Sequence, residues 1–374
     1  MPVYLDYCAS APIDQRVLSE VTRIFMNVYG NADSRTHLFG LQAKETVEKS
    51  RRTIAEILGL DKSEIIFTSG ATESNNLAIL GLLEYGLNIG KKHIITSAIE
   101  HKSVLEPMHY LKKKGFELEL IYPDSSGRIK VEDVLSRTKK DTLLVSIMHV
   151  NNETGVIQPI EPIGEELSKQ DILFHVDAAQ SFGKLNGILR NTKYNMLSLS
   201  GHKIQAPQGI GALALKRKKY KRPPINPLFY GGQQEYGFRP GTLPVPLIAG
   251  FAYAALLSEQ EKNVWEKNTM AIKEQFLNTI KDLRYVINGD PNYCLPNIIN
   301  ISFLGIDSES VFSALRGDYA FSNGSACTSS NYVPSYVLTA MGLREDIINQ
   351  ALRISWGSNS NVEFKRFIEY IKSI

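Results

Sequence analysis

The 374-residue chain has few cysteines and no long apolar run, and both shortages exclude classes of protein. Its three cysteines, Cys8, Cys294 and Cys327, are odd in number and far apart, so neither a disulfide framework nor a structural zinc site is indicated. No apolar run is long enough to span a bilayer, and the first residues lack the basic and then apolar pattern of a signal peptide. We therefore expect a cytoplasmic protein in which any cysteine that matters acts as a thiol.

The chain also lacks a large excess of charge of one sign. Its formal net charge is only +3, so we do not expect direct binding to nucleic acid. One basic run, residues 216–222, is either a solvated connection or a docking patch for an acidic partner or for nucleic acid. The remaining composition, 43% hydrophobic and 22% charged residues, is typical of an ordinary globular enzyme, and the length favours two or three domains.

Helical patterns and apolar strands alternate along the first two thirds of the chain. Strands are expected at 64–68, 93–96, 117–121, 143–147, 171–176, 196–199 and 211–215, and helices at 17–29, 42–58, from Asn75 onward and at 104–113. Strands separated by helices predict an α/β fold, a mostly parallel sheet flanked by helices on both faces. In such sheets ligands bind beyond the carboxyl ends of the strands.

The last third of the chain predicts a smaller α+β domain. One long helical stretch from Pro246 to about Leu283 is followed by strands at 297–303 and 352–356 and by helices at 308–315, 334–341 and 362–374. We place a large domain at 15–258 and a small domain at 259–374. Residues 1–14 are expected to be extended, to belong with the small domain and to pack near the site.

The strongest chemical signal is a lysine at the end of a strand. Ser200-Gly201-His202-Lys203 closes one apolar strand, and another strand delivers Asp177 to its carboxyl end, with Gln180 one helical turn later. A lysine at a strand end is by itself more often solvated. Together with an acid, however, it matches the needs of pyridoxal phosphate: an amine for a Schiff base and a carboxylate against the pyridinium nitrogen.

A glycine turn at residues 69–75 follows another strand and opens a helix with hydroxyl groups in its first turn. The helix N-terminus, helped by the Thr72 hydroxyl, offers unpaired N–H groups and a positive dipole end to a phosphate monoester. The segment is not a Walker loop, because no Gly-Lys-Ser/Thr follows. A capped helix without a ligand is the alternative.

Four further residues are candidates for the chemistry, although a lone histidine such as His101 is more often a satisfied structural side chain. His101 follows a strand and could stack on a cofactor ring and pass protons, and Asn152 could donate to a ring phenolate or a substrate carboxylate. Cys327 lies among small polar residues, where it is either an activated nucleophile or an incidental surface thiol. Arg353 is a candidate for bidentate capture of a carboxylate or for a structural ion pair.

These segments together resemble one enzyme family along essentially the whole chain. In order and spacing the chain is similar to a group I cysteine desulfurase, and the Gly-Ser-Ala-Cys loop distinguishes this group from aminotransferases of the same fold. The segments that carry the resemblance are Thr68-Ser69-Gly70-Ala71-Thr72-Glu73-Ser74, Glu100-His101, His149-Val150-Asn151-Asn152-Glu153, His175-Val176-Asp177-Ala178-Ala179-Gln180-Ser181, Ser200-Gly201-His202-Lys203 and Gly324-Ser325-Ala326-Cys327.

The resemblance implies fold-type I pyridoxal phosphate chemistry in a homodimer with sites at the subunit boundary. Lys203 then forms the Schiff base, Asp177 pairs with the pyridinium nitrogen, Gln180 with the ring oxygen, and His101 stacks on the ring. The resemblance assigns binding of the cofactor phosphate to Thr72, Ser200, His202 and the partner subunit's Thr242. Ala71 and Asn152 are further cofactor-binding residues. Asn152 and Arg353, with Asn31, are assigned to the carboxylate of L-cysteine. Cys327 attacks the substrate sulfur, leaving alanine and a persulfide for a protein acceptor.

Several positions depart from the family pattern without removing a residue of the chemistry. They are Gln205, Ala206, Gln208, Gln233, Tyr236, Pro240 and Ala32, and they bear on rate, channel shape and partner choice. The chain also ends at Ile374, before the C-terminal extension of housekeeping iron-sulfur cluster members, so a dedicated acceptor is expected: tRNA thiolation, DNA sulfur modification or specialised cluster assembly. The alternatives are a selenocysteine lyase or another enzyme of this fold, and a non-catalytic sulfur-transfer scaffold.

Overall fold

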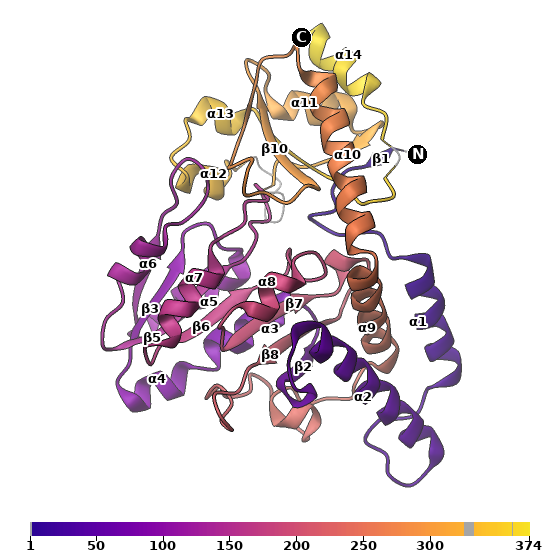
Figure 1. The fold of residues 1–374 in the computed structure, drawn as a ribbon, viewed down its shortest axis with the longest axis vertical. Helices are drawn as coiled ribbons and strands as arrows, with labels where there is room; N and C mark the ends of the chain where they lie inside the picture. The colour runs from indigo at the N-terminus through magenta and orange to yellow at the C-terminus, as the bar shows by residue number, and fades with distance from the viewer. Residues whose placement is uncertain (1, 325–332, 361) are drawn as a thin grey trace.

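A seven-stranded sheet forms the centre of the larger part of the molecule (Figure 1). The computed structural model describes residues 2–324, 333–360 and 362–374. The strands lie in the order β2-β8-β7-β6-β5-β3-β4, and all run parallel except β8, which is antiparallel to β2 and β7. This confirms the expected mostly parallel sheet. The strand bounds are β2 Ile65–Thr68, β3 His93–Ser97, β4 Glu117–Ile121, β5 Thr142–Met148, β6 Leu173–Asp177, β7 Met196–Ser200 and β8 Gly211–Leu215.

Helices cover both faces of this sheet because alternate strand residues point to opposite sides. In β5, Val145 and Ile147 join the apolar core on one face and Leu144 the core on the other. The first face is covered by α1 Gln15–Asn27, α2 Leu38–Leu58, α6 Val131–Ser136, α7 Ile160–Ser168, α8 Asn186–Asn191 and α9 Val245–Gln260, and the second by α3 Ala71–Leu80, α4 Leu83–Ile89 and α5 Lys102–Lys113. This burial on both faces explains the continuous apolar runs in the sequence.

The C-terminal part lies above the sheet in Figure 1 and has its own core. Its antiparallel sheet has the order β12-β10-β9, with β9 Tyr285–Ile287, β10 Ile298–Phe303 and β12 Ala351–Ser355. Its helices are α10 Lys262–Ile280, α11 Ser308–Leu315, α12 Tyr336–Ala340, α13 Glu345–Asn349 and α14 Lys365–Ser373. The domain boundaries given above stay a prediction.

The opening segment links the two parts. β1 (Val3–Tyr4) pairs in parallel with β11 (Tyr319–Ala320), and Asp6 forms a bridge to Ser355. A few residues later the chain bonds to the sheet side of the molecule, where Ala11 N donates to His202 O at 3.0 Å. We call residues 3–14 the strap, since both ends are fixed to different parts of the molecule.

Three expected helices are wrong in their bounds. α2 begins at Leu38 rather than at Gln42, and the His37 side chain caps it by accepting from Gly40 N. α3 begins at Ala71 rather than Asn75, because Gly70 provides the N-cap and the following three residues already belong to the first turn. The stretch from Pro246 to Leu283 is two helices, α9 and α10, which meet at Glu261 (φ −101°, ψ 10°). Among the described residues, no helix combines the length and the apolar character needed to cross a membrane.

Candidate active site

A cavity of ≈ 370 Å³ lies where the carboxyl ends of the parallel strands meet at one edge of the large sheet. Strands β2, β3, β5, β6 and β7 each deliver a segment to this edge, and the strap covers part of it. Ten of the predicted site residues line the cavity: Ala71, Thr72, His101, Asn152, Asp177, Gln180, Ser200, His202, Lys203 and Arg353. The topology therefore gathers residues that are up to 282 positions apart, the separation of Ala71 and Arg353, around one space.

Lys203 lies one turn beyond β7, with its amine held by the strap. Its Nζ donates to the carbonyl oxygen of Ala9 at 2.7 Å and also to that of Cys8. Burial, helped by the positive charges of Arg353 and Lys184, lowers the pKa of Lys203 to about 8. About one tenth of this amine is therefore unprotonated and nucleophilic at pH 7, far more than for a lysine with an ordinary pKa.

A chain of four side chains connects Asp177 to His101. Asn75 Nδ2 donates to Asp177 Oδ2 at 2.7 Å and to Ser103 Oγ at 2.8 Å, and Ser103 Oγ lies 2.8 Å from His101 Nδ1. The Ser103 backbone N–H donates to the same Nδ1 at 3.1 Å. Because Nδ1 accepts this bond, the proton of the neutral imidazole is on Nε2, and burial lowers the pKa of His101 so that the neutral form is favoured.

The turn after β2 forms an anion cup. Gly70 caps α3 without a side chain, so among the described residues no side chain occupies the helix N-terminus. A Cβ on Gly211 would lie 2.7 Å from Gly70 Cα, so only glycine permits this turn to press against β8. Ser200 and His202 face the cup, and burial and the Lys203 charge lower the pKa of His202 to about 4, which leaves it neutral. A phosphate monoester fits this cup of N–H groups, hydroxyls and a neutral imidazole.

Buried polar atoms around the cavity lack protein partners, as expected where a polar ligand binds. Gln180 Nε2 donates to Cys8 O at 2.9 Å, but its Oε1 has no partner among the described residues, and the same holds for Asn152 Oδ1. The lysine, the acid and the anion cup fit the aldehyde, ring nitrogen and phosphate of pyridoxal phosphate.

Arg353 forms the structural ion pair that was one of its two predicted roles. Its Nη2 donates to Asp6 Oδ1 at 2.6 Å and to Ser322 Oγ at 3.2 Å, and Nη1 donates to Asn152 O at 3.1 Å. Nε has no partner in the described part of the chain. Asp6 thus occupies part of the guanidinium that a substrate carboxylate would need.

Two predicted residues of the described part of the chain do not lie at this cavity. Asn31 and Thr242 are exposed and absent from its lining. Cys327 lies outside the described residues, as does most of its loop. The basic run is partly engaged, since Arg222 stacks over Tyr236 at 4.7 Å and Lys216 over Tyr194 at 5.0 Å, while Tyr220 is fully exposed between them.

The sequence interpretation missed Asn75, Ser103 and the strap carbonyls. Asn75 lies in the second turn of α3 and Ser103 in the first turn of α5, two helices that share one apolar core. A predicted helix that began at Ala71 could have pointed to Asn75. The carbonyl groups of Cys8 and Ala9 have no sequence signal, because every residue type carries the same group.

Comparison with known proteins defines the class. The class-V aminotransferase family model matches residues 3–363, so the chain belongs to this family of pyridoxal phosphate-dependent enzymes. Cysteine desulfurase IscS of Serratia proteamaculans (strain 568) is 44% identical over 360 residues, 96% of this chain and 88% of the relative. Two solved structures are also similar. DndA from Streptomyces lividans has 45% identity and a TM-score of 0.84, with 93% of this chain and 98% of that chain covered. SspA in complex with cysteine has 37% identity and a TM-score of 0.84, with 94% of this chain and 98% of that chain covered. Within its class, the chain is a cysteine desulfurase.

Proposed function

We propose that the chain takes sulfur from L-cysteine at this cavity, leaving alanine, and carries it on Cys327 to an acceptor protein. The observation that carries the proposal is the convergence of Lys203, Asp177 and His101 around one cavity with a phosphate cup. Bound pyridoxal phosphate supplies an electron sink for charge that develops on the substrate carbon. The chain's residues supply the binding, the orientation and the proton positions around it.

Lys203 would hold the cofactor through its amine, because burial keeps part of that amine unprotonated. Asp177, fixed by Asn75 and by the backbone N–H of Ala179 at 2.9 Å, would keep the ring nitrogen protonated. His101 would stack on the ring with its proton on Nε2. The amide nitrogen of Asn152 would donate to the substrate carboxylate, together with the Nε of Arg353, which has no partner among the described residues.

Cys327 would act as the nucleophile. Its thiolate sulfur bonds to the substrate sulfur, the carbon–sulfur bond breaks, and the electron pair stays with the carbon, which takes a proton to become alanine. The thiolate form is required because the thiol is a poor nucleophile. Exchange of Cys327 for serine should keep the coloured cofactor and abolish the persulfide, and persulfide formation in that variant would contradict the assignment.

A homodimer would complete the site. Exposed aromatic and aliphatic side chains are frequent in the sequence on both sides of Asn31 and before Thr242: Phe25, Met26, Tyr29, Leu38, Phe39, Leu41, Phe229 and Tyr230. Exposed apolar side chains in this number are typical of an interface. Gln234 joins the two segments, because its Nε2 donates to Asp33 Oδ2 at 2.7 Å and its Oε1 accepts from Gly241 N at 3.0 Å. Thr242 and Asn31 would thus reach the partner's cavity together.

Subunit mixing tests this arrangement. A dimer of one Lys203→Ala chain and one Thr242→Asp chain has one intact site if Thr242 acts across the interface, and none if it acts within its own chain. Random mixing of the two inactive variants should therefore restore about one quarter of the wild-type sites. Alanine release from L-cysteine measures the recovery, and its absence in a confirmed mixed dimer would refute the arrangement.

A further inference from the structure

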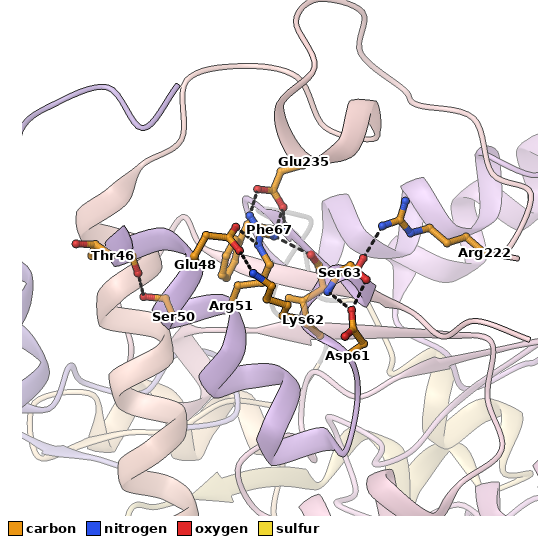
Figure 2. A network of polar contacts seen from close by, with 11 residues as sticks. Thr46, Glu48, Ser50, Arg51, Asp61, Lys62, Ser63, Phe67, Arg222 and Glu235 are labelled. Atoms are coloured by element: carbon orange, nitrogen blue, oxygen red, sulfur yellow. Dashed lines mark hydrogen bonds and ion pairs between the residues drawn. The ribbon is translucent and has the colours of Figure 1, made fainter. Parts of the chain in front are cut away.

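The segment 226–244, which carries Thr242, is fixed to its own subunit by a buried ion pair. Arg51 on α2 donates from Nη1 and Nη2 to the two carboxylate oxygens of Glu235, at 2.7 and 2.6 Å (Figure 2). The Glu235 side chain is fully buried and the Arg51 side chain is 4% exposed. Two parallel bonds between planar groups fix orientation as well as distance.

This pair occupies the free edge of β2, the last strand of the large sheet. Glu235 Oε2 accepts from the Phe67 backbone N–H at 2.6 Å, and Arg51 Nη1 donates to the Ile65 carbonyl oxygen at 2.7 Å (Figure 2). These are the outward backbone groups of an edge strand, which need partners when buried. β2 runs directly into the anion cup, so the pair joins segment 226–244 to the strand that carries the cup.

A second ion pair joins the same segment to the cup itself. Arg239 Nε donates to Glu73 Oε1 at 2.9 Å, and Glu73 Oε2 accepts from the Ser69 backbone N–H at 2.8 Å. Although partial burial opposes it, the bonds from Arg239 and Ser69 lower the pKa of Glu73. Glu73, in the first turn of α3, therefore holds both the cup and the segment. It holds the segment at Arg239, which is three residues before Thr242.

Between these two anchors the backbone is strained. Glu235 and Tyr236 both have left-handed conformations, with φ of 49° and 57°, which residues other than glycine adopt only when their surroundings require it. The ring of Tyr236 lies under the guanidinium groups of Arg51 and Arg222, at 5.6 and 4.7 Å. Two ion pairs and these stacked groups thus hold one defined conformation of the segment.

We propose that Glu235 and Arg239 are positioning residues that make the cup and segment 226–244 one rigid unit, so that each subunit's own cup sets where its Thr242 meets the partner's cofactor phosphate. The proposal rests on the proposed contribution of Thr242 across the dimer interface. It implies that the two cofactor sites are built on a shared framework, in which a loosened segment weakens the neighbouring site.

The test measures the dissociation constant of pyridoxal phosphate from the apoenzyme by fluorescence titration. Glu235→Gln and Arg239→Gln should each weaken binding about tenfold or more while sedimentation still shows a dimer. Phe276→Leu, in the separate C-terminal core, is the matched control: it should lower the thermal midpoint and leave the dissociation constant unchanged. Arg239 is partly exposed, so its variant reports even if Glu235→Gln does not fold.

A double-variant cycle separates positioning from general destabilisation. If Arg239 acts through Thr242, then Arg239→Gln combined with Thr242→Ala should bind the cofactor no more weakly than Thr242→Ala alone. The inference would be overturned if the losses of affinity from Arg239→Gln and Thr242→Ala added in the double variant. It would also be overturned if Glu235→Gln and Arg239→Gln each had a dissociation constant within twofold of wild type. If Thr242→Ala itself leaves cofactor binding unchanged, the contribution across the interface fails instead, which makes the two failures distinguishable.

Discussion

Replacing Ser103 with alanine should change the acidity of the active-site imidazole without touching the cofactor. The Ser103 hydroxyl lies between a buried amide and His101 Nδ1, so Ser103→Ala removes one of the two bonds that mark Nδ1 as an acceptor. It also leaves one Nδ2 proton of Asn75 unpaired, at a side chain that has no exposed surface. The backbone N–H of Ser103 stays in place.

The magnitudes follow from these bonds. A hydrogen bond to the neutral imidazole contributes about 0.5–1.5 kcal/mol, and about 1.4 kcal/mol corresponds to one pH unit. Since the bond favours the unprotonated Nδ1, its loss raises the pKa of His101. The other influences on this pKa stay in place: burial and the Lys203 and Lys102 charges lower it, and the Asp177 charge raises it. The acid limb of the rate profile should therefore move upward by up to about one pH unit. The stranded amide proton should cost about 1–3 kcal/mol of unfolding free energy.

Initial rates of alanine formation across pH, with thermal unfolding in parallel, provide the assay. Ser302→Ala is the matched control, because Ser302 Oγ likewise accepts from a buried amide, Asn288 Nδ2 at 2.8 Å, and donates onward, to Ile347 O at 2.8 Å. It should lose similar stability with an unchanged pH profile, and Ser103→Thr should restore the wild-type profile. An acid limb that stays in place in Ser103→Ala would refute the tautomer assignment.

Three other predictions follow from the site. Lys203→Ala should lose both alanine formation and the absorbance of the lysine-bound cofactor, since Lys203 is the cavity lysine whose amine the strap carbonyls of Cys8 and Ala9 hold. A variant that keeps both would remove Lys203 from its role. Asp177→Asn should lower the turnover number by 100-fold or more, measured as alanine release, because a neutral amide cannot hold the ring nitrogen protonated; near-normal turnover would contradict this. Reversing the charges of Lys218 and Lys219 should slow sulfur transfer to the true acceptor at low salt and spare alanine release, whereas unchanged transfer would leave the basic run as a solvated turn.

The large sheet could be predicted because its strands are buried on both faces. Runs such as residues 143–147 are apolar without alternation, and glycine or polar residues end them at the edge where the cavity forms. Lys203 and Asp177 were predictable for the same reason, since Asp177 ends one such run and Lys203 lies one turn after another. The strand ends then had to converge, because the strands are parallel.

Other features could not be predicted because they depend on tertiary contacts. The break between α9 and α10 has neither proline nor glycine, and Glu261 at the break is held by Arg16 from α1, at 2.5 and 3.0 Å. The start of α3 was missed because Thr72 and Ser74 are weak helix formers. The cup requires a first turn whose N–H groups are not bonded by a side-chain cap, and Gly70 provides this. Asn31 and Thr242 could be assigned to a site only by resemblance, because neither reaches the cavity of its own chain.

The strap sets the order in which the site can be completed during synthesis. Its carbonyls hold the Lys203 amine near one end, and its other end pairs with Tyr319 and Ser355. The first residues of the strap thus wait for partners that are synthesised more than 300 residues later, since Val3 pairs with Tyr319. Such long-range pairings form late and carry a large loop-closure cost. A nascent chain stalled before residue 319 should therefore have its sheet and its lysine but not the strap that covers it.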